Sequence, residues 1–455
     1  MLSFLKVCKM EGKIDKHAEA NQYDGYVLRT HMIGDLSGEL DGKEVTVAGW
    51  THEVRETGKI TFLLLRDNTG ILQVIAKSGE VDDKIMKKMS VPKESVLTIK
   101  GIVKKNKEAR MGFELVPKEI VNLNPLSKPI PFEVTGKVPA DMDVRLNYRY
   151  IDLRRLENVA IFKIQSTILQ SFRNFFVEKN FIEIRPPSIV AEATEGGAEL
   201  FKVDYFDQKA FLAQSPQLYK QLAVIGGMEK VFMLTPIFRA EKSNTVYHLS
   251  EVTQMDIEMA FADADDVIKL LSEVVTRTIR DVLKNNKPEL ETLRAQLKEP
   301  KVKIVEYSDV IAELRKKGSS IKIGHDFSRE HESKLQEIYG DEVIVKDFPA
   351  EVRAFYCMPK EKNSKFTNSF DFIYKGLEIS SGAQRIHIPD MLIESIKRKG
   401  LNPKSFEFYI DAFRSGAPPH SGWSIGLERL TMQICGVKNI RESTLFPRDR
   451  KRLTP

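Results

Sequence analysis

The sequence predicts an α+β protein with a small N-terminal β-barrel and a larger domain in which helices flank an antiparallel sheet. Residues 44–121 contain five short β-rich runs separated by Gly, Asn, Thr and Lys, a pattern typical of a barrel or a sandwich. Apolar residues then recur at helical spacing in residues 159–180, and two apolar runs in residues 231–261 flank a polar loop. These patterns predict a long helix and an antiparallel hairpin.

The five β-rich runs indicate a specific kind of barrel. They read EVTVAGWTHEV, ITFLLLRD, GILQVIA, SVLTIKGIV and GFELVPKEIV, and five strands in so short a segment are typical of an OB-fold. Such barrels stack nucleic-acid bases on exposed aromatic rings, while basic residues follow the backbone. Arg55, Phe62 and Gln73 are candidates for that face. The pattern alone fits Phe62 equally well in the core.

Composition limits the compartment and the partners that we expect for the protein, but it does not indicate a function. The net charge of +6 permits a polyanionic partner but does not require one. Cys8, Cys357 and Cys435 show no CxxC spacing, which argues for a reducing compartment and against a disulfide framework or a zinc site. No apolar stretch approaches the ~18 residues that a membrane span needs, so we expect a cytoplasmic protein with no membrane partner.

Changes in composition along the chain predict its domains. Residues 1–27 have few apolar anchors and are expected to form a loosely ordered extension. The barrel domain spans 28–124, and the proline-rich stretch 125–147 is expected to be a linker or hinge. The larger domain spans 148–455, and within it residues 286–365 are charged and irregular and receive no chemical role.

The hairpin predicted at residues 231–261 carries several charges. Arg239 lies at the end of the first run, while Asp256 and Glu258 lie on the second. Buried charges are costly unless a ligand or a partner engages them, and the planar fork of an arginine suits a phosphate. A structural ion pair between Arg239 and Glu241 or Glu258 is the alternative interpretation.

Three segments of the larger domain together resemble a known family. Phe238-Arg239-Ala240-Glu241, followed by His248 and Glu251, resembles motif 2 of the class II aminoacyl-tRNA synthetases, and Gly426-Leu427-Glu428-Arg429 resembles motif 3. The helix and strand that end at Pro187 are similar to motif 1, which builds the dimer interface in that family. From about Arg29 to Pro455, the order of these segments resembles the archaeal and eukaryotic aspartyl-tRNA synthetases.

The resemblance implies a two-step reaction in which ATP activates L-aspartate and the aspartyl group passes to the 3′ end of tRNA(Asp). It implies catalytic roles for Arg239 at the α-phosphate, for Arg429 at the γ-phosphate and for Glu378. His248 joins the ATP-binding set, and Glu241 accepts from the adenine amino group. A fixed cation beside a phosphate that gains charge accelerates such a step.

The resemblance also implies a magnesium ion, held by Asp371, Glu378 and Ser381. Magnesium prefers oxygen ligands and bridges phosphates while retaining waters, so few protein ligands suffice. Ordinary solvation at a strand edge is the alternative interpretation for the two acids.

Aspartate recognition is assigned by the same resemblance. Arg385, assisted by Lys220, would bind the side-chain carboxylate, and Ser381 lies close by. Two cations aimed at a carboxylate favour aspartate over asparagine. The α-amino group would be bound by Glu195, Gln217 and Asp256.

The choice of tRNA stays open. By resemblance, Phe62 and Gln73 contact the central anticodon base, and His52 and Arg55 belong to the same face. His52 is typical of enzymes that also charge tRNA(Asn), whereas Arg110 is closer to the lysine of strict enzymes. These two clues conflict.

Alternatives and departures accompany this hypothesis. An asparaginyl-tRNA synthetase is disfavoured by Lys220, and a non-catalytic RNA-binding paralogue is disfavoured because Arg239, Glu378 and Arg429 are all present. Departures from the family pattern affect the fit around ATP and motif 3. They are Tyr247, Val252, Ser421 and Ser424.

Overall fold

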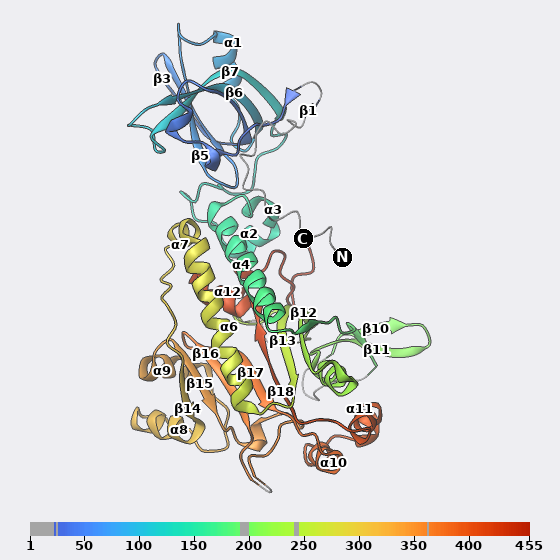
Figure 1. Cartoon of the computed structure of the whole chain (residues 1–455). Coiled ribbons are helices and arrows are strands. Elements are labelled where there is room, and N and C mark those ends of the chain that lie inside the picture. Colours follow the sequence, from blue (N-terminus) through green and yellow to red (C-terminus); the bar gives the residue numbers. More distant parts are fainter. Residues whose placement is uncertain (1–21, 24–25, 192–199, 241–244, 362–363) are drawn as a thin grey trace. The chain divides into compact units, whose positions relative to one another are not determined.

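The computed structural model describes residues 22–23, 26–191, 200–240, 245–361 and 364–455. The chain forms two compact units, Met1–Leu156 and Glu157–Pro455, and each is described by itself (Figure 1). The predicted N-terminal extension lies outside the described residues apart from two short paired strands, β1 (Gln22–Tyr23) and β2 (Tyr26–Val27).

The first unit contains the predicted five-stranded barrel. Its strands close in the order β3-β4-β5-β7-β6. Their bounds are β3 (Glu44–Thr57), β4 (Ile60–Arg66), β5 (Ile71–Lys77), β6 (Val96–Lys105) and β7 (Phe113–Asn124), with the short helix α1 (Asp83–Met89) packed against β7. Side chains alternate across a strand, so Leu63 and Leu65 of β4 fill the core. Phe62 is only half-buried and lies on the outer face.

The segment after the barrel is packed within the same unit. It contains α2 (Met142–Asn147) and α3 (Arg149–Asp152). Its small core includes Phe132, Val134 and Ile151, and the side chains of Arg149 and Asp152 form a fully buried ion pair. The stretch 125–147, predicted to be a linker or hinge, therefore contributes Phe132 and Val134 to a small core.

An eight-stranded sheet is the frame of the second unit, in the order β14-β15-β16-β17-β18-β13-β12-β8. The predicted hairpin is confirmed, because β12 (Lys230–Phe238) and β13 (Glu251–Ala260) pair antiparallel. β13 continues antiparallel into the neighbouring strands of the sheet. These are β18 (His420–Gly426), β17 (Leu377–Gln384) and β16 (Ser369–Tyr374), while β8 (Ile182–Glu183) lies parallel at the edge beside β12.

Two long helices, α4 (Leu156–Glu178) and α6 (Ala264–Asn285), cover one face of this sheet (Figure 1). Phe172 and Phe176 of α4 pack against Trp423 of β18, with ring centroids 6.1 and 5.8 Å apart. Asp263 caps α6 by accepting a hydrogen bond from the backbone N–H of Asp266, which fixes where that helix begins. The helix predicted from the apolar spacing in residues 159–180 is thus confirmed as α4.

Residues 286–365 were predicted to be irregular, and that prediction is wrong. β14 and β15 pair in parallel and extend the central sheet beside β16. The elements are α7 (Lys287–Leu293), β14 (Lys303–Glu306), α8 (Tyr307–Lys316), α9 (Arg329–Tyr339) and β15 (Glu342–Lys346). β14 has no clear alternation, because it is a four-residue edge strand with mostly exposed side chains.

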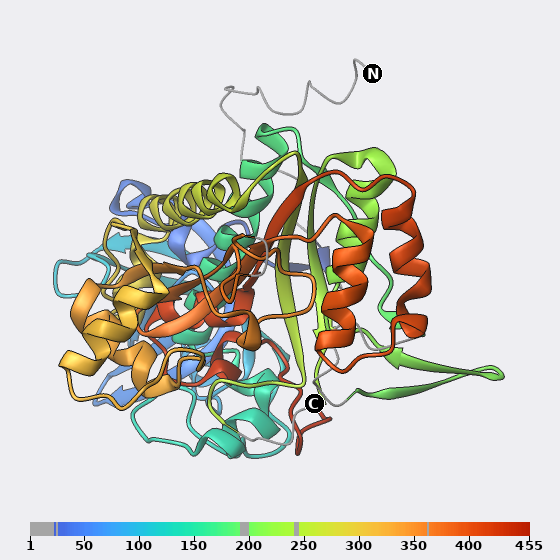
Figure 2. The ribbon, with the colours of Figure 1, turned by 90° about the horizontal axis from the view of Figure 1, so that it is seen from below.

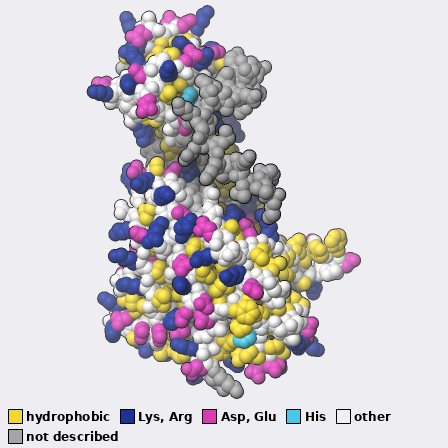
Figure 3. Space-filling view, in the orientation of Figure 1, with side chains coloured by type: hydrophobic (Ala, Val, Ile, Leu, Met, Phe, Trp, Pro, Cys, Tyr) yellow, Lys and Arg dark blue, Asp and Glu magenta, His cyan; other side chains and the backbone are white. Residues whose placement is uncertain are grey.

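A small sheet of β9 (Ile189–Val190), β10 (Lys202–Tyr205) and β11 (Gln208–Leu212) ends in a projecting hairpin (Figure 2). On the face shown in Figure 3, hydrophobic side chains gather on this hairpin, and basic and acidic side chains are interspersed elsewhere. The remaining helices are α5 (Gln217–Ala223), α10 (Pro389–Arg398), α11 (Glu407–Arg414) and α12 (Leu427–Cys435). No helix among the described residues has the length and apolar character to cross a membrane.

Candidate functional site

Two adjoining cavities lie over the central strands of the second unit. Their volumes are about 160 and 220 Å³, and they share the lining residues Arg239, Gln254, Ser381 and Ser424. The first cavity is also lined by His248, Glu378, Glu428 and Arg429, and the second by Gln217, Asp256, Arg353 and Arg385. A ligand with two parts can therefore occupy both. The sequence analysis named most of these side chains, and the structure brings them together.

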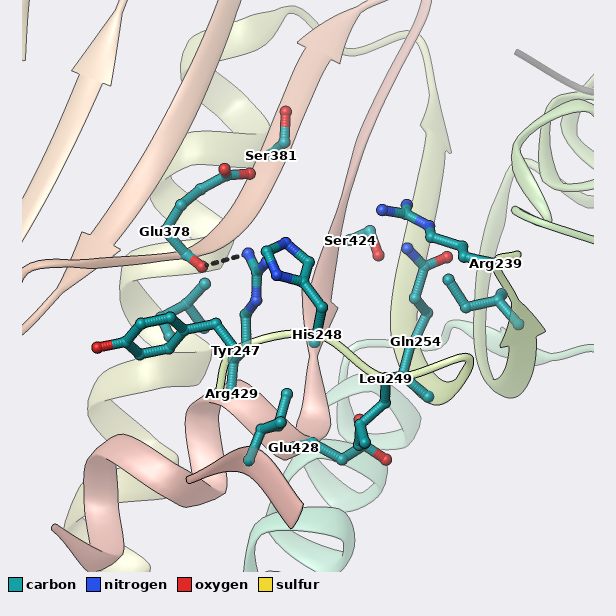
Figure 4. A pocket seen from close by; sticks show the side chains of 15 residues that line it. Arg239, Tyr247, His248, Leu249, Gln254, Glu378, Ser381, Ser424, Glu428 and Arg429 are labelled. Carbon is teal, nitrogen blue, oxygen red and sulfur yellow. Dashed lines mark hydrogen bonds between the residues drawn. The ribbon is translucent and has the colours of Figure 1, made fainter. Parts of the chain in front are cut away.

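One wall of the first cavity depends on an irregularity in strand β17. Asp371 of β16 lies opposite Ser381 of β17, but the register shifts so that Ile373 lies opposite Glu378. In a regular strand, Glu378 and Ser381 would face opposite sides of the sheet. The extra residue of the bulge places Glu378 on the same side as the other two. Figure 4 shows Glu378 and Ser381 on this wall, with Arg239, Gln254 and Ser424 across the cavity.

One acid on this wall has a shifted proton affinity. Burial and the nearby charge of Asp371 raise the pKa of Glu378 to about 7. A neighbouring like charge disfavours the ionised carboxylate, and a nearby cation favours it. The donor set of two carboxylates and one hydroxyl contains only oxygen, the ligand type that magnesium prefers. The residues therefore fit such an ion, although no cluster of three His, Cys, Asp or Glu side chains occurs in the described ranges.

The turn from β18 into α12 supplies Glu428 and Arg429 to the first cavity. Arg429 donates from Nη1 to the backbone oxygen of Glu378 at 3.0 Å (Figure 4), which orients its guanidinium beside that acid. Both carboxylate oxygens of Glu428 accept from the backbone N–H of Thr253 at 3.0 Å. Burial raises the pKa of Glu428 to about 7. The pair of residues thus ties α12 to strands β17 and β13.

A closed charge network forms the floor of the second cavity. Arg385 donates from Nε and Nη2 to the two carboxylate oxygens of Glu258 at 2.9 and 3.2 Å. Lys220 is fully buried, donates to Oδ2 of Asp256 at 3.0 Å and lies 3.5 Å from Glu258. Gly422 allows this approach, because a Cβ there would lie 2.2 Å from a carboxylate oxygen of Glu258. Lys220 is absent from the lining of both cavities, so it supports the acids from behind.

Several buried polar atoms around the cavities have no hydrogen-bond partner within the described ranges. They include Oδ1 of Asp256, Oε1 of Gln254 and Oγ of Ser424. An unpaired buried polar group costs about 1–3 kcal/mol, and such groups are expected where a ligand completes the bonding. Two of these atoms are acceptors, so the geometry suits a ligand that donates hydrogen bonds, such as an ammonium group.

The first unit holds the second candidate site, on the outer face of the barrel. Arg55 lies directly opposite Phe62 on the neighbouring strand. Gln73 lies opposite Leu64, two residues from Phe62 along β4, so Phe62 and Gln73 share one face. His52 sits at a bulge in β3, and its Nδ1 accepts from Nη1 of Arg66 at 2.9 Å. Burial and the charge of Arg66 lower the pKa of His52, which therefore presents a neutral ring.

Both sites agree with what known proteins share with this chain. Residues 141–450 match the class II tRNA synthetases (D, K and N). Residues 45–123 match a family of OB-fold nucleic acid binding domains that is named for the tRNA anticodon. The chain belongs to the class II tRNA synthetases. This synthetase is 47% identical to the aspartate–tRNA(Asp/Asn) ligase of Methanocaldococcus jannaschii, over 94% of this chain and 98% of that one.

Other relatives differ in the tRNA or the amino acid for which they are named. The aspartate–tRNA(Asp) ligase of Thermococcus kodakarensis is 45% identical over 94% of this chain and 100% of its own length. The crystal structure of asparaginyl-tRNA synthetase from Pyrococcus horikoshii with asparaginyl-adenylate has a TM-score of 0.88 and 34% identity. It covers 93% of this chain and 99% of that chain. The fold is therefore shared across both amino-acid specificities.

Some predicted site residues cannot be placed, and others were missed. Glu195 and Glu241 lie outside the described residues. Gln254 and Glu428 were not assigned a role from the sequence, although both flank predicted site residues on β13 and α12. Arg353 was missed because it lies in the segment that was predicted to be irregular.

The departures from the family pattern have identifiable surroundings. The guanidinium of Arg329 on α9 lies 4.4 Å from the ring centroid of Tyr247, which lines the first cavity. The segment 286–365 thus places a cation beside this tyrosine. Val252 lines the same cavity. Ser421 donates to the backbone oxygen of Ala262 at 2.8 Å, which gives it a structural role away from the ligand.

Proposed function

We propose that this synthetase is an aspartate–tRNA ligase. It would join L-aspartate to the α-phosphate of ATP to form aspartyl-adenylate with release of pyrophosphate, and then transfer the aspartyl group to the 3′ end of tRNA(Asp) with release of AMP. The observation that carries this proposal is the second cavity. It has a rigid guanidinium, that of Arg385, and an unpaired buried carboxylate oxygen, that of Asp256. These groups complement a side-chain carboxylate and an α-ammonium group.

In the proposed aspartate complex, Arg385 binds the side-chain carboxylate through Nη1, which its pair with Glu258 does not use. Asp256 and Gln217 bind the α-ammonium group, and the predicted contribution of Glu195 belongs to the same set. Lys220 acts indirectly, because its contacts hold Asp256 and Glu258 in place. The substrate is thus bound at both charged ends.

The first cavity would hold the nucleotide. Arg239 lines both cavities and stabilises the charge that develops on the α-phosphate when the aspartate carboxylate attacks it. Arg429 binds the γ-phosphate, His248 belongs to the ATP-binding set, and Glu241 is the proposed partner of the adenine amino group. The site works by holding the two reactants in line and by stabilising charge.

Asp371, Glu378 and Ser381 would hold the magnesium ion that accompanies ATP. When bound, the ion neutralises phosphate charge and fixes the phosphate chain. Glu378 must be ionised to serve as a ligand. The raised pKa therefore makes this wall responsive to the arrival of a cation.

The outer face of the barrel would bind the anticodon, with Phe62 as the stacking platform and Gln73, Arg55 and His52 around it. Whether tRNA(Asn) is also charged stays open, because relatives of both kinds are about equally similar. We also propose a homodimer through the motif 1 segment. Val177 and Ile182 of that segment are 55% and 49% exposed in the single chain.

Charging of purified tRNA(Asp) and tRNA(Asn) with aspartate tests this function, with asparagine as the competing amino acid. Aspartate should be attached to tRNA(Asp), and Arg385→Ala should abolish the reaction. Attachment of asparagine instead would support the alternative that this chain is an asparaginyl-tRNA synthetase. That alternative is considered because an asparaginyl-tRNA synthetase has the same fold. Attachment of neither amino acid would support the non-catalytic alternative.

A further inference from the structure

A buried ion pair occupies the place where the proposed metal ligands converge. Nη1 of Arg353 donates to Oδ1 of Asp371 at 2.9 Å and to Oγ of Ser381 at 3.2 Å, and Nη2 donates to Oδ2 of Asp371 at 2.5 Å. The guanidinium carbon lies 3.7 Å from the ring centroid of Phe348. Only 11% of the Arg353 side chain is exposed. One guanidinium thus engages two of the three side chains proposed to bind the metal.

This arrangement disfavours a second cation. Both oxygens of Asp371 already accept hydrogen bonds from Arg353. A divalent ion bound to the same carboxylate would lie a few ångströms from the guanidinium, in a buried region where charges are poorly screened. The two cations therefore compete for one carboxylate, unless an anion is also present to compensate them.

The anchoring of Arg353 is incomplete, which suits a side chain that changes partner. Its Nε is buried without a hydrogen-bond partner among the described residues, whereas Nε of Arg385 is bonded to Glu258. Arg353 also lies just after the short turn η4 (Ala350–Val352) and not within a strand. The unbonded Nε therefore raises the free energy of the state in which Arg353 is paired with Asp371. The backbone that carries Arg353 also lies outside the central sheet.

We propose that Arg353 is an internal counter-ion that competes with the divalent metal for Asp371 and Ser381. The nucleotide-free site then binds the metal weakly by itself and accepts it together with ATP, whose phosphates offer the guanidinium a new partner. Arg353 lines the second cavity and donates to Ser381, which lines both cavities. A phosphate group where the two cavities meet would therefore lie near its guanidinium. The inference rests on the metal site of the proposed ligase function.

The test measures Mn²⁺ binding to the full-length, nucleotide-free protein by electron paramagnetic resonance of the free ion. Arg353→Gln and Arg353→Met remove the charge, and both should bind Mn²⁺ at least tenfold more tightly than the wild type. Arg353→Lys keeps the charge and should stay within threefold of the wild type. Arg398→Gln, an exposed position on α10, is the matched control and should change nothing.

Two further measurements keep the test decisive. Asp371→Asn combined with Arg353→Gln should abolish the gain, which locates it at this carboxylate. Thermal unfolding checks each variant, and Arg353→Met preserves packing on Phe348 if the glutamine variant does not fold. Unchanged or weaker Mn²⁺ binding in folded neutral variants would overturn the proposal, because Arg353 would then only orient Asp371.

Failure of this inference can be told apart from failure of the proposed function. The binding assay uses neither aspartate nor tRNA. Tighter Mn²⁺ binding in the neutral variants of a chain that charges no tRNA would leave the counter-ion standing and reject the ligase. Normal charging with unchanged Mn²⁺ binding would reject the counter-ion alone.

Discussion

Two buried arginines line the same cavity, and their carboxylate partners set them apart. Glu258, the partner of Arg385, is fully buried and has Lys220 as a second cation. Asp371, the partner of Arg353, lies opposite the hydroxyl of Ser381 and raises the pKa of the neighbouring acid Glu378. Two cations, Arg385 and Lys220, therefore lie beside Glu258, whereas Asp371 has the cation Arg353 and the acid Glu378 as its neighbours.

The geometry of a bidentate ion pair therefore does not by itself determine the role of its arginine. The charges around the pair also matter. Both pairs have short contacts and little exposure. The pair at Glu258, which Lys220 supports as a second cation, holds its arginine fixed and ready to bind an anion. The pair at Asp371 adjoins a second acid, Glu378, so a metal ion can compete with its arginine for the carboxylate. Four predictions test this contrast, from the largest effect to the smallest.

The largest effect is expected from Arg385→Ala. Removing one partner of a buried, hydrogen-bonded charge pair costs about 2–5 kcal/mol, so kcat/KM for aspartate should fall by about a thousandfold in ATP–pyrophosphate exchange. Arg398→Ala serves as the surface control. A larger loss of aspartate affinity in Arg353→Ala than in Arg385→Ala would mean that the two arginines have exchanged roles.

Stability should distinguish the two carboxylates. Glu258→Gln leaves Arg385 and Lys220 facing a neutral group, and breaking a buried pair in this way costs about 3–5 kcal/mol. Asp371→Asn should cost much less, because it also relieves repulsion with Glu378. Urea unfolding of the two isosteric variants measures both values. Equal losses would show that the acidic neighbour of Asp371 has no energetic weight.

Glu428 extends the contrast to a buried carboxylate that has no ion pair within the described ranges. Burial raises its pKa from 4.5 to about 7, whereas the cations beside Glu258 outweigh burial and lower the pKa of that residue. The folded state therefore holds the proton more tightly than the unfolded chain. The contribution of Glu428 to stability falls as pH rises from about 4.5 to 7.

Glu428→Gln should remove this dependence. Relative to the wild type, the variant should gain on the order of 3 kcal/mol in unfolding free energy between pH 4.5 and pH 8. Urea unfolding of both proteins at each pH isolates the contribution of this one group. A constant difference between the two proteins would show that Glu428 is ionised throughout.

The smallest effect is expected for an exposed pair. Arg55 pairs with Glu53 at 3.1 Å, but the Arg55 side chain is 65% exposed. Solvent-exposed pairs contribute about 0–1 kcal/mol, so Arg55→Ala should leave the urea midpoint nearly unchanged. Its proposed role predicts weaker tRNA binding instead. A clear loss of stability with unchanged tRNA binding would make Arg55 a structural residue.

Sequence patterns predicted the elements in which apolar residues recur at a regular spacing. The β-rich runs predicted the barrel and the hairpin of β12 and β13, and helical spacing predicted α4. The arginines of the proposed ATP and aspartate sites were found because short motifs surround them. The structure brings Arg239, Arg429 and Arg385 to two adjoining cavities.

The remaining features depend on contacts that no local pattern contains. The bulge that turns Glu378 toward Asp371 arises from the pairing of β16 with β17. No residue pattern in 377–384 predicts it. Arg353 meets Asp371 only because the segment after β15 folds back over the sheet. Lys220 was predicted to assist Arg385 at the substrate carboxylate. Its burial against Asp256 and Glu258 depends on contacts with another part of the chain and could not be predicted from the sequence.

Amino-acid activation by the purified wild-type protein tests the central claim most directly. ATP–pyrophosphate exchange should depend on aspartate, with kcat/KM at least a hundredfold higher than for asparagine, because asparagine gives Nη1 of Arg385 a neutral amide in place of a carboxylate. This assay requires no tRNA and so probes the two cavities alone. Exchange that depends equally or more strongly on asparagine would contradict the account.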